Sequence, residues 1–476
     1  MPEMTHQRRM LVLAICCMSL LIVGLDTTIV NVALPAIQRE LHASVSGLQW
    51  TVDAYTLVIA SLLILAGSTA DRLGRARTFQ VGLVVFTAGS LLCSLAPGLG
   101  WLVAFRMVQA VGGSMLNPVA MSIITNVFTD PRERARAIGV WGATVGISLA
   151  LGPVVGGALV DSVGWRSIFW INIPVGLAAL VLTMRYVPES RAEHPRRLDT
   201  VGQVLVLILL SALTYGIIEG PGRGWGSPLI IGCFVAAAAA LVVLVPYEFR
   251  RPEPLIDPRF FRSVPFSSAT VIAVCAFAAL AGFLFLNTLY LQNVRGLSPF
   301  RAGLLTLPVA MMTVVFAPIS GRLVGTRGTR LPLLVAGVGM SMAGLMLTGL
   351  TPTTSLGWLI ASYAVFGLGF AMVNPPITNT AVSGMPRAQA GVAAAVASTS
   401  RQVGASLGVA VVGTVVAAGI DRGFVAASHL GWWIVAGCGL VVLVLGFVSS
   451  GRWAAASADA VRTSMAPARA PADVPA

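Results

Sequence analysis

The sequence predicts an all-α integral membrane protein with fourteen transmembrane helices. Of its 476 residues, 56% are hydrophobic and only 10% are charged, whereas a soluble globular chain is about 25% charged. The apolar residues fall in runs close to the ~20 residues that a helix needs to cross a bilayer. Arginines gather in the short segments between these runs. This composition excludes a water-soluble enzyme of the same length, a disordered chain and a disulfide-rich domain.

The predicted spans follow from the apolar runs in chain order. They lie near 10–35, 46–70, 78–97, 101–128, 136–160, 167–187, 200–218, 228–247, 264–292, 302–324, 331–350, 357–380, 389–419 and 430–450. The first run is longer than the ~7–15 residues of a secretory signal and contains a charge, so we expect it to be retained. The turn 351–355 separates the eleventh span from the twelfth. Fourteen crossings of about 22 residues leave room for loops and tails but not for a soluble domain.

Arginine placement predicts the orientation. All 31 basic residues are arginine; 23 of them lie on the two tails and on every second loop, and six lie on the opposite loops. By the positive-inside rule, both termini are expected in the cytoplasm and the chain in the plasma (inner) membrane. The same placement explains the net charge of +13 without a nucleic-acid partner.

A weak internal repeat predicts two halves. The loop Gly67–Arg75 after the second span and the loop Gly321–Gly328 after the tenth share their glycine spacing, although only the first carries an acid, Asp71. Two parallel six-helix repeats with an inserted pair of helices fit this spacing. The expected parts are an N-terminal bundle at 1–190, a linker with inserted helices 7 and 8 at 191–262, a C-terminal bundle at 263–450, and a disordered cytoplasmic tail at 451–476.

Four motifs carry a family resemblance. They are Leu25–Pro35 in span 1, the Gly67–Arg77 loop, Arg106–Gly113 in span 4 and Gly152–Gly157 in span 5. On these motifs the chain resembles the major facilitator superfamily, and more narrowly the fourteen-spanner drug:proton antiporters of the EmrB/QacA type. Thr69 and Ser148 depart from the usual leucine and glycine. The resemblance implies two six-helix bundles that alternate around a central cavity.

Four ionisable residues lie well within the predicted spans: Asp26, Asp53, Arg106 and Arg401. Each would cost ~2.5–3.5 kcal/mol at the bilayer centre, so each should face a partner or water. Asp26, Asp53 and Arg106 are expected at similar depth in the outer half, which leaves one negative charge uncompensated. A proton or a cationic substrate can supply the missing charge. The alternative for Asp26 is a static pair with Arg106 that ties two helices together. The resemblance associates both acids with coupling and drug recognition.

Two further motifs have roles implied by the resemblance. The cytoplasmic gate would comprise Gly67, Asp71, Arg72, Gly74 and Arg75; the alternative is a solvated loop that only sets topology. The antiporter motif comprises Gly152, Pro153, Gly156 and Gly157, for which we expect a hinge or a packing seam rather than a binding site.

Helical spacing gives further candidates for cavity lining. Span 4 has a polar face, and span 12 has an aromatic face that could stack a planar cation or simply pack against other helices. Arg401 has no acid within the spans of its own half, so it serves either structure or the return of a protonated acid. The candidates are Trp50, Tyr55, Gln109, Asn117, Asn287, Tyr290, Tyr363, Phe366, Phe370, Asn374 and Arg401.

Several classes of site have no signature in the sequence. All four histidines lie in predicted tails or loops, and the six cysteines lie in apolar runs without a C-x-x-C. There is no nucleotide-binding loop and no H-E-x-x-H. We therefore expect no enzyme activity, no cofactor and no metal, and transport that is driven by an ion gradient or is passive.

The predicted function is proton-coupled export of amphipathic, cationic drugs or toxic compounds. The alternative is export of an endogenous lipid, siderophore or secondary metabolite by the same machinery. The expected partners are protons, small amphipathic substrates and membrane lipids, and a monomer is expected. A periplasmic adaptor, which some members of the resembled family use, is not predicted by any motif in the chain. An intramembrane enzyme and a transporter-like sensor are disfavoured by the histidine placement and by the short tail.

Overall fold

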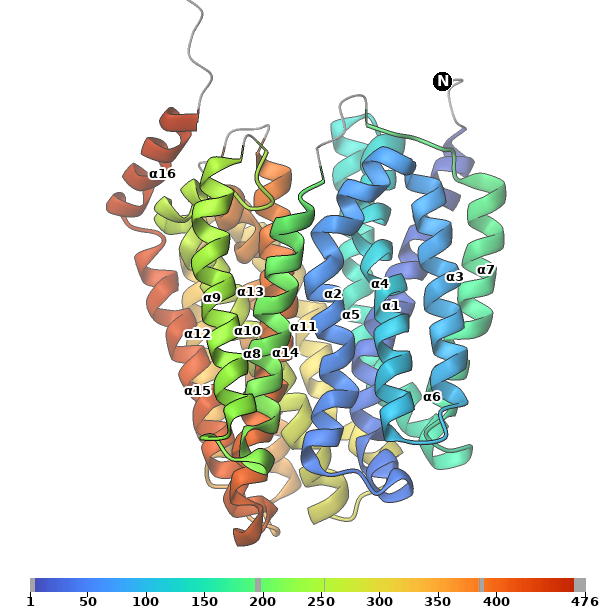
Figure 1. The fold of residues 1–476 in the computed structure, drawn as a ribbon, viewed down its shortest axis with the longest axis vertical. Coiled ribbons are helices and arrows are strands. Elements are labelled where there is room, and N and C mark those ends of the chain that lie inside the picture. Colours follow the sequence, from blue (N-terminus) through green and yellow to red (C-terminus); the bar gives the residue numbers. More distant parts are fainter. Residues whose placement is uncertain (1–4, 193–197, 252, 384, 386–388, 466–476) are drawn as a thin grey trace, which may run out of the picture.

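The computed structural model describes residues 5–192, 198–251, 253–383, 385 and 389–465. Every regular element in these residues is a helix (Figure 1). Fourteen of the described helices are long and apolar enough to cross a membrane. The predicted fold class and number of spans are therefore confirmed.

The N-terminal bundle contains the first six spans. Its helices are α1 (His6–Leu41), α2 (Val45–Leu73), α3 (Arg75–Ser94), α4 (Leu99–Val127), α5 (Pro131–Ser162), α6 (Ser167–Trp170) and α7 (Asn172–Tyr186). The last two together form the sixth span. Side-chain caps begin several helices: Ser44 accepts from the backbone N–H of Gly47 at 3.2 Å, and Asp130 accepts from two N–H groups of α5.

The C-terminal bundle contains the last six spans. After the 3₁₀ turn η1 (Pro258–Arg262) come α10 (Val264–Leu289), the π turn η2 (Tyr290–Val294), α11 (Pro299–Arg327), α12 (Arg330–Leu347), α13 (Leu356–Val382), α14 (Ala390–Gly419), η3 (Ile420–Arg422) and α15 (Phe424–Val448). The bundles meet along two seams, where α2 packs on α14 and α5 packs on α11. Along the chain, the inserted helices α8 (Thr200–Arg223) and α9 (Pro228–Arg250) come between the two bundles.

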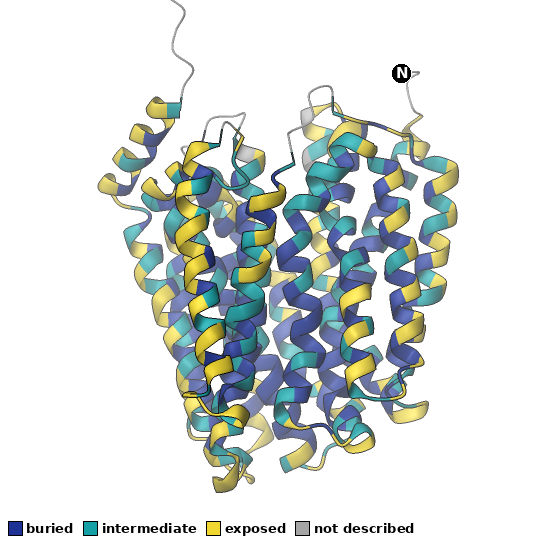
Figure 2. Ribbon diagram, viewed as in Figure 1, coloured by how far each residue is buried: buried dark blue, intermediate teal, exposed yellow. Residues whose placement is uncertain are grey.

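The inserted pair lies over one seam. Helix α8 packs on both α2 and α14, and α9 packs on α8 (Figure 1). The Gln203 amide donates to the backbone oxygen of Ser61 on α2, and the Thr414 hydroxyl of α14 donates to the backbone oxygen of Ile217 at 2.8 Å. Much of α9 is exposed on its outer side (Figure 2), as expected of a helix that faces lipid.

The prediction of a disordered tail is wrong for its first part. Residues Arg452–Met465 form helix α16, which packs on α10 and η1. Ala454, Ala458 and Val461 share one buried face at helical spacing. Alanine, which is frequent in this segment, has the highest helix propensity, and the buried face gives the helix a surface to pack on. The rest of the predicted tail, 466–476, lies outside the described residues.

Hydrogen bonds between the bundles lie toward one end of the molecule. We call the end that carries the N-terminus the terminal end and the other the distal end (Figure 1). Among the described residues, the Gln49 amide donates to the backbone oxygens of Val409 and Ala410, and the Gln292 amide donates to that of Val32, all in the distal half. The hydrogen bonds between the bundles in the described residues therefore close the distal half.

Close helix packing in the N-terminal bundle depends on glycine. A Cβ on Gly112 of α4 would stand 2.3 Å from the backbone nitrogen of Phe86 on α3. Real Cβ atoms do not approach a backbone so closely, so a side chain there would push the two helices apart.

Gly112→Ala is therefore expected to destabilise the protein by about 1–3 kcal/mol, the range for overpacking a tight interior. The measurement is thermal unfolding of the detergent-solubilised protein. Gly232→Ala in α9 is the matched control, because a Cβ there meets nothing within 4 Å. It should leave stability unchanged or raise it by up to ~1 kcal/mol through helix propensity. Equal effects of the two substitutions would contradict the role assigned to the α3–α4 contact.

Candidate functional site

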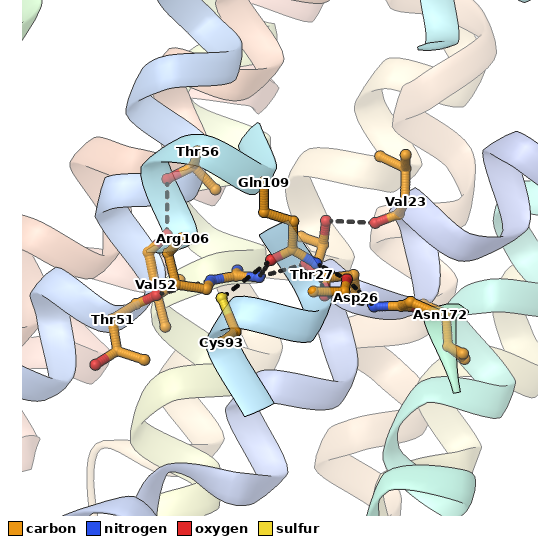
Figure 3. A network of polar contacts seen from close by, with 12 residues as sticks. Val23, Asp26, Thr27, Thr51, Val52, Thr56, Cys93, Arg106, Gln109 and Asn172 are labelled. Carbon is orange, nitrogen blue, oxygen red and sulfur yellow. Dashed lines mark hydrogen bonds and ion pairs between the residues drawn. The ribbon is translucent and has the colours of Figure 1, made fainter. Parts of the chain in front are cut away.

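A buried ion pair lies at the centre of the N-terminal bundle. Asp26 of α1 and Arg106 of α4 are 0% and 1% exposed, and Arg106 Nη1 lies 2.5 Å from Asp26 Oδ2. The same guanidinium donates through Nε to the backbone oxygen of Thr51 on α2 at 3.3 Å. Arg106 therefore links three helices around one carboxylate (Figure 3).

Neutral polar side chains complete the coordination of the pair. The Gln109 amide donates to Asp26 Oδ1 at 2.8 Å and to Ser90 Oγ at 2.6 Å, while its oxygen accepts from Arg106 at 2.7 Å. The Asn172 amide donates to Asp26 Oδ1 at 3.0 Å. Both carboxylate oxygens of Asp26 thus have donors, and helices α3 and α7 are tied to the same network (Figure 3).

An aromatic ring covers the guanidinium. The Tyr55 ring of α2 lies 4.1 Å from Arg106 Cζ, a cation–π distance, and Tyr55 is fully buried. Tyr55 was predicted to line a cavity; the structure instead packs it against the ion pair. A planar cation is already present at this ring, so it offers no free face for a substrate.

The close approach of α3 and α4 explains how short side chains reach the pair. A Cβ on Gly89 would stand 2.5 Å from the Cα of Gln109. Because this contact is so tight, Ser90, the next residue of α3, comes within hydrogen-bond distance of the Gln109 amide. Neither Ser90 nor Asn172 was predicted as a site residue. Asn172 is an amide within the predicted span 167–187, whereas nothing in the sequence singles out Ser90.

Asp53 lies apart from this network. It is 0% exposed on α2, and its nearest hydrogen bond is a long one, 3.5 Å from Thr56 Oγ1 to Asp53 Oδ1. Asp53 Oδ2 has no hydrogen-bond partner among the described residues. The Ser406 hydroxyl of α14 also lies near the carboxyl, without a partner of its own in that part of the chain. Asp53 is therefore a buried carboxyl without a cation, at the seam between the two bundles.

The glycines of the antiporter motif lie at helix contacts. Cβ atoms on Gly152 and Gly156 would stand 1.9 Å from Thr28 Oγ1 and 2.4 Å from Ile29 Cγ1, both on α1. A Cβ on Gly157 would stand 2.6 Å from the Cα of Phe300 on α11. Next to them, the backbone oxygen of Pro153 lies 2.1 Å from the position of a Cβ on Gly303. This stretch of α5 packs on its own bundle with one face and on the partner bundle with the other.

The predicted gate loop is tied to the end of the sixth span. Arg75 Nη2 lies 2.9 Å from Asp71 Oδ1, one helical turn away. Gly74 has φ +117°, which favours glycine, and a Cβ there would meet the Glu189 carboxylate at 2.6 Å. Glu189, which the sequence did not suggest, caps α3 by accepting from Ala76 N at 3.1 Å.

The remaining gate residues lie nearby. Arg72 is half-buried at the end of α2. A Cβ on Gly67 would stand 3.9 Å from the Cβ of Pro118 on α4. The backbone N–H of Ala192 donates to the backbone oxygen of Asp71 at 3.1 Å, which continues the connection with the chain after α7. Between described residues, the hydrogen bonds of Asp71 thus stay within the N-terminal half.

Comparison with known proteins identifies the family. A family model described as the Major Facilitator Superfamily matches residues 16–409. The chain belongs to the major facilitator superfamily. It is a transporter by family, and in bacteria this multi-pass protein lies in the plasma membrane.

Similar proteins include named resistance and export proteins. The chain is 38% identical over 413 residues to multidrug resistance protein Stp of Mycobacterium tuberculosis, covering 87% of this chain and 77% of that protein. It is 39% identical over 408 residues to the tetracenomycin C resistance and export protein of Streptomyces glaucescens, covering 85% and 75%. It is 36% identical over 400 residues to the methylenomycin A resistance protein of Streptomyces coelicolor, covering 82% of each.

Solved structures share the fold. A bacterial homologue of the human lysosomal transporter Spinster, described as inward-facing and unoccupied, has a TM-score of 0.63 at 19% identity, covering 97% of this chain and 98% of that one. A POT family transporter in complex with a thioalcohol-conjugated peptide has a TM-score of 0.69 at 17% identity, covering 92% and 96%.

In this facilitator, several predicted cavity residues lie inside the C-terminal bundle. Tyr363 and Phe366 are fully buried, and Phe366 stacks on Phe283 at a centroid distance of 4.4 Å. The Tyr363 hydroxyl donates to Asn287, and the Tyr290 hydroxyl donates to the backbone oxygen of Thr351 at 2.6 Å. These contacts favour the packing interpretation of the aromatic face.

Other candidates are distributed differently. Trp50 donates through Nε1 to Glu219 of α8 at 2.8 Å, so it faces the inserted pair rather than a central cavity. Phe370 packs edge-on against Phe277 at 5.3 Å. Asn117 and Asn374 are half-buried, and the side-chain oxygen of each has no hydrogen-bond partner among the described residues.

Arg401 has only neutral partners among the described residues. It donates to Ser398 Oγ at 3.2 Å and to Thr378 Oγ1 at 2.5 Å, and its Cζ lies 6.0 Å from the Phe277 ring. Thr378 is exposed on α13. Among the described residues within the spans, Asp53 of the N-terminal half thus has no cationic partner and Arg401 of the C-terminal half has no acidic partner.

Removing one partner of the central pair should lower the free energy of unfolding more than neutralising both partners. Arg106→Gln leaves Asp26 buried without its cation and is expected to destabilise the facilitator by about 3–5 kcal/mol. The double variant Asp26→Asn/Arg106→Gln should recover part of that loss, because two neutral amides can hydrogen-bond. The measurement is a double-mutant cycle of unfolding free energies in detergent micelles. Strict additivity of the two single effects would refute the pairing.

Proposed function

We propose that this facilitator exports amphipathic toxic compounds in exchange for protons, with Asp53 as the exchanging carboxyl. The observation that carries the proposal is the contrast between the two acids. Asp26 is compensated by Arg106 and by two amides, whereas Asp53 is equally buried and has no cation among the described residues. Protonating Asp26 would break its stabilising interaction with Arg106, whereas a carboxyl without a cationic partner readily takes up a proton or a cationic group.

Mutual exclusion at one carboxylate produces exchange. A proton neutralises Asp53, and a cationic substrate neutralises it equally well, but both together would leave an excess positive charge in an apolar seam. Binding of one therefore favours release of the other. Asp53 lies where α2 meets α14, so its charge state acts on the contact that must break and reform as the two bundles rock.

The direction of transport follows from the orientation that we propose. The arginine distribution supports placing the terminal end in the cytoplasm. In that orientation the hydrogen bonds between the bundles close the outer side. Substrate would then enter from the cytoplasmic side. Asp71 and Arg75 would regain a role as a gate only when the terminal end closes.

A second candidate substrate class is an anionic or zwitterionic aromatic metabolite. Arg401 has no acid near it among the described residues and lies beside Phe277 and the exposed Thr378. A guanidinium next to an aromatic ring suits a planar molecule with a carboxylate or phenolate.

Transport in proteoliposomes loaded with a pH dye tests the proposal. A planar cation such as ethidium should dissipate an imposed proton gradient through the wild type but not through Asp53→Asn. Asp459→Asn, which changes an exposed carboxylate on α16, is the control and should match the wild type. Undiminished proton movement through Asp53→Asn would refute the proposed coupling site. If only anionic aromatic compounds move protons, and Arg401→Gln abolishes this, the second substrate class is correct.

A further inference from the structure

A second pair of buried carboxyls lies in the inserted helices, far from the central ion pair in the chain. Asp199 immediately precedes α8, and Glu248 lies in the last turn and a half of α9. The two residues are 4% and 3% exposed. Burying two carboxylates together is unfavourable unless cations or protons compensate them.

The two carboxyl groups face the same point. A Cβ on Gly202 would stand 2.4 Å from Glu248 Oε1 and 2.7 Å from Asp199 Oδ2. No side-chain donor of the described residues reaches Glu248 or Asp199 Oδ2, although the backbone N–H groups of Leu255 and Ile256 lie near the Glu248 carboxyl. The absence of a side chain at Gly202 makes room for this close approach, and no side-chain donor in the described chain separates the two acids.

The surrounding charges do not balance the pair. From α9, the Tyr247 hydroxyl donates to Asp199 Oδ1 at 3.0 Å. Arg251, just after α9, has Nη2 3.7 Å from Asp199 Oδ1 and is the one guanidinium paired with these acids in the described chain. Glu253 lines a small pocket beside Asp199.

Among the described residues, the other elements next to the pair add no further cation to it. On the side of α2, that pocket is lined by Ile64, Leu65 and Ser68, which carry no charge. On the side of η1, Asp257 and Arg259 pair with one another at 2.8 Å. Within the described part of the chain, two acids against one arginine leave a positive charge missing, and their unpartnered oxygens lie close to the same point.

We propose that Asp199 and Glu248 form a proton-binding site in which one proton is shared between the two carboxyls. The shared proton provides the side-chain donor that the described residues lack, and it removes one of two facing negative charges. The Asp199 side chain also caps α8 by accepting from Gly202 N at 2.9 Å, and Gln203 one residue later binds the backbone of α2. The proton therefore holds α9 to the start of α8 at the place where the inserted pair is fastened to the N-terminal bundle.

Loss of the proton should loosen this attachment. With the shared proton bound, the folded chain holds a proton at pH values where the unfolded chain has already released it. Folding stability therefore falls as rising pH removes the shared proton. The site is independent of the proposed transport function, because it concerns the folded protein without substrate.

Thermal unfolding of the full-length protein in detergent, from about pH 5 to about pH 9, tests the inference. Glu248→Gln places a neutral amide donor against Asp199 and should abolish the decline in Tm with rising pH that the wild type shows. Asp199→Asn should do the same while keeping a good helix cap. Asp459→Asn is the control and should follow the wild type.

Infrared spectroscopy gives a readout that stability alone does not. Near neutral pH the wild type should show a carbonyl stretch of a protonated carboxyl that is missing from both Glu248→Gln and Asp199→Asn, whereas any band from Asp53 stays in both variants. An unchanged band in both variants, or equal pH slopes of Tm in wild type and variants, would overturn the inference. Suppression of the wild-type pH slope by sodium or potassium would also overturn it, because a metal cation would then occupy the site.

Discussion

The need to balance each charge inside an apolar bundle determines how the N-terminal half is built. An isolated charge at the bilayer centre costs ~2.5–3.5 kcal/mol, so Asp26 and Arg106 are stable there only together. Their contacts draw in Thr51, Gln109 and Asn172 from three different helices. The half therefore behaves as one body built around a single ion pair. The same requirement makes Asp53 chemically distinct, because the one buried arginine of this network is already engaged.

Glycine placement determines which polar groups can meet. Gly89 lets α3 approach Gln109, and Gly176 of α7 approaches Thr87 so closely that a Cβ would stand 2.2 Å from its hydroxyl. The C-terminal half is packed just as tightly, for example at Gly369 against Met340, but aromatic stacking rather than an ion pair occupies its centre. The two repeats thus share a frame and differ in what fills it. Charge chemistry is concentrated in one half, and Arg401 is the exception in the other.

Sequence patterns predicted the fold because bilayer thickness fixes span length and arginine marks the loops. They also singled out Asp26, Arg106 and Gln109, since charged and amide groups are conspicuous in apolar helices. They gave the pair of Asp26 with Arg106 only as an alternative, because Asp26 and Asp53 lie at similar depth and only helix packing distinguishes them. Trp50 was misplaced for a related reason: its partner Glu219 lies on an inserted helix whose position no periodicity reveals. Ser90 and Glu189 are ordinary residues by composition, and their contacts arise only from tertiary structure.

The inserted pair also breaks the symmetry of the molecule within the plane of the membrane. Helix α8 packs along the seam of α2 and α14, whereas at the other seam apolar side chains of α5 and α11 such as Val145 and Val315 are exposed. The transporter therefore has a shielded flank and a bare flank. A lipophilic molecule diffusing laterally in one leaflet meets two unlike surfaces, and the bare flank is the side on which bilayer lipids touch the junction between the moving halves directly.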